Sequence, residues 1–95
     1  MSTRDAYVQK MKAALDEWNA ELSRLEARAA AAQADARIKY NAQIESVRKQ
    51  RDAGRAKLRE LESASEAAWR DMQRGFESAW DDIHRAAREA LRRFD

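Results

Sequence analysis

The chain has 95 residues, with 19 Lys or Arg against 17 Asp or Glu, a formal net charge of +2, and neither Cys nor Pro. This length allows at most one domain, and the lack of Cys excludes a disulfide framework, a thiolate metal site and a cysteine nucleophile. The abundance of Ala, Glu, Arg and Lys is typical of long helices and coiled coils, whereas Leu, Ile, Val and Phe supply only 13 residues, too few to predict a compact globule.

The N-terminus carries charged residues among its first apolar ones, which is unlike a signal peptide. No apolar run approaches the length of a membrane span. A cytoplasmic, all-α protein is therefore expected.

The first predicted element, residues 3–47, is a helix with a heptad seam, in which apolar residues recur at alternating spacings of three and four. Its large members are Val8, Met11, Leu15, Trp18, Leu22 and Leu25, followed by small ones in the Ala-rich run 27–36. Two spacings of four in a row, Ala32 to Ala36 to Tyr40, indicate a stutter in a helix that continues. The seam then resumes at Ile44 and Val47.

A basic connector, residues 48–57, comes next. Over residues 48–59 there are six basic side chains and one acidic side chain, Asp52; the basic ones are Arg48, Lys49, Arg51, Arg55, Lys57 and Arg59. Such a stretch could contact nucleic-acid phosphates or anionic lipid headgroups. A solvated helix face is the favoured interpretation, because no aromatic residues interleave with the basic ones and the overall charge is nearly balanced. Nucleic acid is therefore an unfavoured partner.

The third segment, residues 58–94, follows an eleven-residue repeat. Ala68-Trp69-Arg70-Asp71-Met72 is echoed by residues 79–83 and again by residues 90–94. Eleven residues are close to three full helical turns, so the large side chains return to nearly one line. The predicted seam positions are Leu58, Leu61, Trp69, Met72, Phe76, Trp80, Ile83 and Leu91, with Phe94 closing the last repeat.

These segments predict one very long, nearly continuous amphipathic helix, roughly 140 Å long at 1.5 Å per residue, that forms a coiled coil. Two places could bend it: the polar stretch Gln50–Gly54, and residues 61–66, where Ser63 and Glu66 have the spacing of a capping box. A bend within residues 50–66 gives the alternative fold, an antiparallel two-helix hairpin. Folding at Gln50–Gly54 would place the Ala-rich run opposite Gly75 and Phe76.

A single helix of this kind exposes its whole apolar stripe, and each large side chain removed from water contributes about 1.5–3 kcal/mol. A second copy, the same chain folded back, or a lipid surface could cover it. The first option predicts a non-enzymatic, self-associating protein, a homo-oligomer paired through the seam. The alternative is a peripheral protein whose aromatic face, Trp69, Phe76 and Trp80, lies on an anionic membrane, although acidic residues on the polar face count against it.

No catalytic constellation is present in the sequence. His84 is the only histidine and lacks companions for a metal site. There is neither a phosphate-binding loop nor a nucleophile–base pair. The expectation is therefore a protein without enzymatic activity, cofactor or small-molecule substrate.

The two ends of the chain resemble a known family. Residues 4–12 read Arg-Asp-Ala-Tyr-Val-Gln-Lys-Met-Lys and residues 15–22 read Leu-Asp-Glu-Trp-Asn-Ala-Glu-Leu, while Ala68-Trp69 and residues 76–80 form an aromatic-spaced tail. This pattern is similar to that of small bacterial coiled-coil proteins, the stress-response proteins of the cyanobacterial type. The resemblance implies a cytoplasmic helical protein linked to stress, and it supplies no activity, ligand or functional residue.

Overall fold

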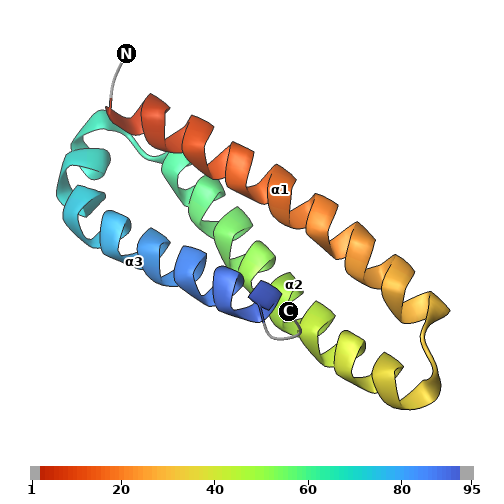
Figure 1. Ribbon diagram of the computed structural model, residues 1–95. Helices are drawn as coiled ribbons and strands as arrows, with labels where there is room; N and C mark the ends of the chain where they lie inside the picture. Colours follow the sequence, from red (N-terminus) through yellow and green to blue (C-terminus); the bar gives the residue numbers. More distant parts are fainter. Residues whose placement is uncertain (1–2, 93–95) are drawn as a thin grey trace.

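The computed structural model describes residues 3–92, which form three α-helices and no strand (Figure 1). The helices are α1 (Thr3–Ala31), α2 (Ala34–Ser63) and α3 (Glu66–Arg92). The molecule measures 52 × 18 × 18 Å. The all-α class is confirmed. The single continuous helix is wrong, and so is the two-helix hairpin, because the chain reverses twice.

The first reversal, Ala32–Gln33, lies where the sequence indicated a stutter. Arg37 secures it by donating from Nε to the Ala29 carbonyl (3.2 Å) and from Nη2 to the Ala32 carbonyl (3.1 Å). Carbonyls at a helix end have no partner within the helix, and the guanidinium supplies one here. The two successive spacings of four therefore coincide with a turn, and the seam residues before and after it face each other across the hairpin.

The second reversal, Ala64–Ser65, lies inside the predicted region 61–66. Ser65 is the N-cap of α3: its Oγ accepts from the Ala68 amide at 3.1 Å and its carbonyl accepts from the Trp69 amide at 2.8 Å. The predicted box Ser63–Glu66 is wrong in detail, since the Ser63 hydroxyl donates to the Glu60 carbonyl instead. Arg4 of α1 clasps this turn by contacting the Ala64 carbonyl and the Glu66 carboxylate.

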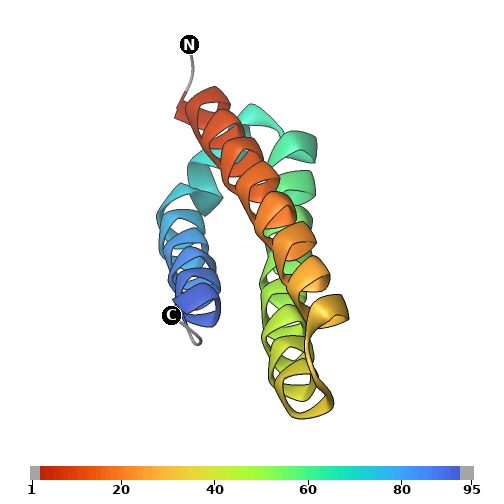
Figure 2. The same cartoon turned by 45° about the vertical axis from the view of Figure 1, so that its right-hand side comes forward.

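The three helices form an elongated bundle with one projecting end. α1 and α2 run antiparallel, and α3 returns beside α2 (Figures 1 and 2). Gln43 of α2 receives the C-terminal part of α3 by donating from Nε2 to the carbonyls of Ala90 (2.8 Å) and Leu91 (3.1 Å). Beyond this point the α1–α2 hairpin continues past the described end of α3. Residues 29–40, which make up this projection, are called the hairpin tip below.

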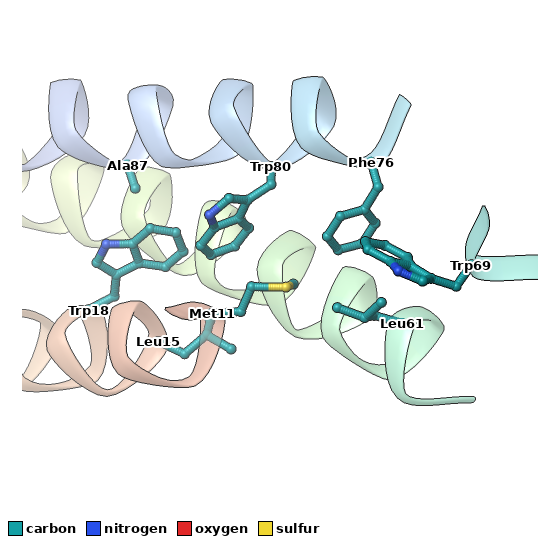
Figure 3. Close-up of a cluster of buried hydrophobic side chains, with 8 residues drawn as sticks. All are labelled: Met11, Leu15, Trp18, Leu61, Trp69, Phe76, Trp80 and Ala87. Carbon is teal, nitrogen blue, oxygen red and sulfur yellow. The ribbon is translucent and has the colours of Figure 1, made fainter. Parts of the chain in front are cut away.

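Aromatic rings fill the core where α1 faces α3 (Figure 3). Trp18 and Trp80 stack with centroids 5.6 Å apart and planes 27° apart, and Tyr7 contacts the edges of Trp69 and Phe76 at 5.8 and 6.0 Å. Each aromatic side chain buries a large area, so few of them are needed. The expectation that the apolar residues are too few for a packed core was therefore wrong. A second cluster nearer the tip contains Leu22, Leu25, Ala29, Ile44, Val47 and Ala90.

Gly54 lies in the middle of α2, which continues through Gln50–Gly54, so of the two possible bends this one is not used. A Cβ atom on Gly54 would lie 3.1 Å from Leu15 Cδ2, 3.2 Å from Trp18 Cζ3 and 3.4 Å from Trp80 Cζ3. The missing side chain allows two indole rings to approach the α2 backbone. The predicted pairing of the Ala-rich run with Gly75 and Phe76 is also wrong, since Phe76 packs in the aromatic core and Gly75 is exposed.

Candidate functional site

The predicted seam residues lie in the core of one chain. The buried ones are Met11, Leu15, Trp18, Leu22, Leu25, Ile44, Val47, Leu61, Trp69, Phe76 and Trp80. The half-buried ones, packed against the same clusters or beside them, are Val8, Leu58, Met72, Ile83 and Leu91. Phe94 lies outside the described residues. The homo-oligomer was inferred from an apolar stripe exposed on a single helix, and in the fold this stripe is covered by the same chain. The homo-oligomer stays a prediction.

The aromatic face predicted for a lipid surface points inward. Trp69 is 4 % exposed, Phe76 3 % and Trp80 1 %. In the closed bundle these rings touch protein, so lipid contact through them would require α3 to leave the bundle. Within residues 3–92, none of the helices combines the length and apolar character needed to cross a membrane.

Half of the predicted basic stretch is neutralised within the chain. Arg48 bridges Glu26 and Glu45, each at 3.1 Å. Arg51 contacts Asn19 and Asp52, each at 3.3 Å, and Lys57 pairs with Glu60 at 3.4 Å.

The other three basic side chains, Lys49, Arg55 and Arg59, are exposed, and none forms an ion pair with another residue in 3–92. Lys49 is separated from Arg55 and Arg59 around the circumference of α2, given 3.6 residues per turn. The basic stretch of the sequence is therefore not a uniform cationic surface in the fold.

The hairpin tip carries a surface feature that sequence reasoning missed. An open hollow of about 660 Å³ lies between α1 and α2 and extends from the tip toward the middle of the hairpin; it is lined by Glu26, Ala29, Ala30, Arg37, Asn41, Ile44, Glu45 and Arg48. Small side chains form part of its lining, and both signs of charge are present. One residue after Arg37 on α2, Ile38 is 69 % exposed, the one large hydrophobic side chain so exposed in the described chain, and it does not line the hollow. Ile38 lies off the seam, so periodicity had no means of singling it out.

Two titratable side chains lie against the aromatic core. The pKa of Tyr7 is raised above its usual 10.0 by burial, by a hydrogen bond with Glu77 and by the negative charges of Glu77 and Asp81. His84 packs beside the rings of Trp18 and Trp80, at centroid distances of 6.0 and 6.2 Å. No cluster of three or more His, Cys, Asp or Glu residues suited to a metal ion occurs between residues 3 and 92.

Comparison with known proteins finds no matching family profile, no matching curated protein and no matching solved structure. The resemblance to the bacterial stress-response family therefore stays a prediction. The geometry of the chain itself carries the functional argument.

Proposed function

We propose that this protein is a non-enzymatic helical protein that associates with copies of itself, and that the contact is made at the hairpin tip. The observation that carries the proposal is the exposure of Ile38 at the hairpin tip, one residue after Arg37, which lines the hollow. Elsewhere in the described chain the large apolar side chains are buried or half-buried. Covering an isoleucine side chain contributes about 1.5–3 kcal/mol.

The charges at the tip favour an identical partner. Arg37 and Arg48 line the same hollow as Glu26 and Glu45. A two-fold interface brings the same patch together from both subunits, so a patch with both signs of charge can complement itself. Binding to nucleic acid or anionic lipid would require a strongly cationic surface on this protein. That surface has less support, because three of the six basic side chains are already paired.

Light-scattering mass across the micromolar range tests the proposal. We expect a concentration-dependent rise from the chain mass of 11.0 kDa toward twice that value. Ile38→Lys should weaken the association, whereas Ala56→Lys, a change at another exposed position on α2 away from the tip, should not. A constant mass of 11.0 kDa at every concentration would exclude self-association.

The alternative of a peripheral membrane protein makes a separate prediction. If α3 leaves the bundle to place Trp69, Phe76 and Trp80 on lipid, the protein should co-sediment with anionic vesicles at low salt. The burial of these rings argues against that result.

A further inference from the structure

The residues of the turn between α1 and α2 favour a helix over a turn. We propose that α1 and α2 straighten into one helix and exchange between two copies, so that α1 of each chain packs on α2 and α3 of its partner. This inference rests on the proposed self-association but places the contact along the α1–α2 seam. Ile38 lies about 160° around α2 from both Ala36 and Tyr40, given 3.6 residues per turn, so it stays outside the exchanged interface. Ile38→Lys should therefore disrupt a tip-to-tip contact and spare an exchanged dimer.

The residues of the turn are helix formers. Residues 28–34 read Arg-Ala-Ala-Ala-Ala-Gln-Ala, and Ala, Arg and Gln have among the highest helix propensities. Gln33, the N-cap of α2, makes no side-chain capping bond. The guanidinium of Arg37 is the side chain that holds the turn. The Ala64–Ser65 turn differs, because it has a serine cap and the clasp of Arg4. Local preference and tertiary structure thus conflict at the first turn only.

Straightening leaves every seam residue on the same helical face. From Leu25 the core positions continue as Ala29, Ala32, Ala36, Tyr40, Gln43 and Val47, at spacings of three and four throughout. One helix over residues 3–63, about 90 Å long at 1.5 Å per residue, therefore carries a continuous stripe. The contacts of α1 with α2 and α3 can re-form between chains without any side chain changing face.

Opening also gives regular helical partners to the two carbonyls that Arg37 contacts; in the closed turn the Ala29 carbonyl accepts from the Ala32 amide as well, at 3.2 Å. In a continuous helix the carbonyls of Ala29 and Ala32 accept from the amides of Gln33 and Ala36, four residues on. The hairpin register pairs Glu26 with Arg48 and Lys12 with Glu62. If the two chains keep that register, the two-fold axis lies near Arg37, the midpoint of both pairs. The half-buried side chains of Ala32, Ala36 and Tyr40 then meet a partner helix.

A proline at the first residue of α2 separates the closed and exchanged forms. Ala34→Pro fits the hairpin, because proline suits the first position of a helix and Gln33 already has φ −70° and ψ 163°, the extended conformation that precedes proline. In the exchanged dimer the same proline lies inside a helix, once in each chain. Two such prolines should weaken dimerisation by roughly four orders of magnitude.

Glu66→Pro, compared with Glu66→Ala, is the matched control, since Glu66 is the first residue of α3 at the other turn. Glu66→Ala accounts for the loss of the carboxylate that Arg4 contacts. We expect the wild-type protein and Glu66→Pro to dimerise and Ala34→Pro to remain at 11.0 kDa with unchanged helical circular dichroism. A dimer of Ala34→Pro as strong as that of the wild type overturns the exchange but leaves self-association standing. A monomeric wild-type protein overturns both.

A cross-link gives a second readout that does not depend on a variant folding. Lys12 Nζ and Glu62 Oε2 lie 3.9 Å apart across α1 and α2, within reach of zero-length carbodiimide coupling. In a dimer mixed from isotope-labelled and unlabelled chains, exchange predicts Lys12–Glu62 peptides that join a labelled to an unlabelled segment. Lys57 and Glu60, 3.4 Å apart on one helix, should couple only within a chain. Lys12–Glu62 peptides found only within single chains would overturn the exchange.

Discussion

Trp18 of α1 and Trp80 of α3 stack with their ring centroids 5.6 Å apart, and both rings press on the α2 backbone at Gly54. All three helices thus meet at this one point (Figure 3 shows the two indoles). Trp18 is 2 % exposed and Trp80 1 %, so both rings are enclosed by protein atoms. The two stacked rings lie between α1 and α3 and set the distance between these two helices here.

Adding one methyl group at Gly54 should loosen the bundle. Gly54→Ala places a Cβ 3.1–3.4 Å from Leu15, Trp18 and Trp80, and overpacking of this kind costs about 1–3 kcal/mol. Helix propensity returns about 1 kcal/mol of this, so the variant should be clearly less stable than Gly75→Ala. Gly75→Ala is the control, because nothing lies within 4 Å of its Cβ position. It should stabilise the fold by about 1 kcal/mol through helix propensity alone. Urea unfolding followed by circular dichroism measures both; equal stabilisation by the two variants would contradict the packing described for Gly54.

Ser65 should stabilise α3 and Ser63 should not. Ser65→Ala removes the hydroxyl that accepts from the Ala68 amide, and loss of such an N-cap costs about 1 kcal/mol. Ser63→Ala removes an exposed bond to a carbonyl within α2, so its thermal midpoint should stay close to that of the wild type. The reverse order of the two midpoints would restore the capping box inferred from the sequence.

Gln43→Glu should release the C-terminal part of α3. The change replaces a donor by an acceptor facing the carbonyls of Ala90 and Leu91, and a buried polar group left unpaired costs about 1–3 kcal/mol. The negative end of the helix dipole adds to this cost. Gln9→Glu, on the exposed side of α1, is the control and should be nearly neutral.

Hydrogen exchange measures the Gln43→Glu effect directly, with faster exchange expected in the last turns of α3. Acidification protonates the introduced carboxyl group and restores a donor, so the difference from the wild type should shrink at low pH. Unchanged exchange in α3 would show that Gln43 does not hold this helix.

Tyr7 should make the fold sensitive to alkali. Its pKa is raised in the folded state by burial, by the hydrogen bond with Glu77 and by the charges of Glu77 and Asp81. The stability it contributes is therefore complete below its ordinary pKa of 10.0 and is lost as the pH rises through the higher folded value. Tyr7→Phe keeps the ring contacts with Trp69 and Phe76 but removes the ionisable group. The free energy of unfolding of this variant should fall less between neutral and alkaline pH; parallel curves would exclude Tyr7 as the cause.

The helical nature of the chain could be predicted from periodicity, whereas its reversals could not. A turn is normally announced by Gly, Pro or a cap, and Ala32–Gln33 has none of these. Spacings of four and four fit a continuous helix with a stutter as well as a hairpin with aligned arms. Only the tertiary packing of α1 on α2 distinguishes them. Gly54 suggested a bend where the helix is continuous. Its role depends on the rings of Trp18 and Trp80, which lie 36 residues earlier and 26 residues later in the chain.

The surface was harder to predict than the core. The basic stretch is continuous in sequence, but the partners of Arg48 and Arg51 include Glu26 and Asn19 on another helix. The Arg48–Glu26 ion pair and the Arg51–Asn19 hydrogen bond require the antiparallel pairing of α1 with α2, whereas the acids Glu45 and Asp52 lie on α2 itself. Ile38 was missed for a related reason: it becomes conspicuous only once the other large apolar side chains are seen to be covered.

The stacked indoles also provide an internal optical signal. Trp18 lies on α1 and the other two tryptophans, Trp69 and Trp80, on α3, while α2 has none. Two indoles at 5.6 Å couple their electronic transitions, so the docked bundle should show an exciton couplet in circular dichroism that disappears when α3 separates from α1. The docking of the third helix can therefore be timed in the unmodified chain, without a label and independently of helix content.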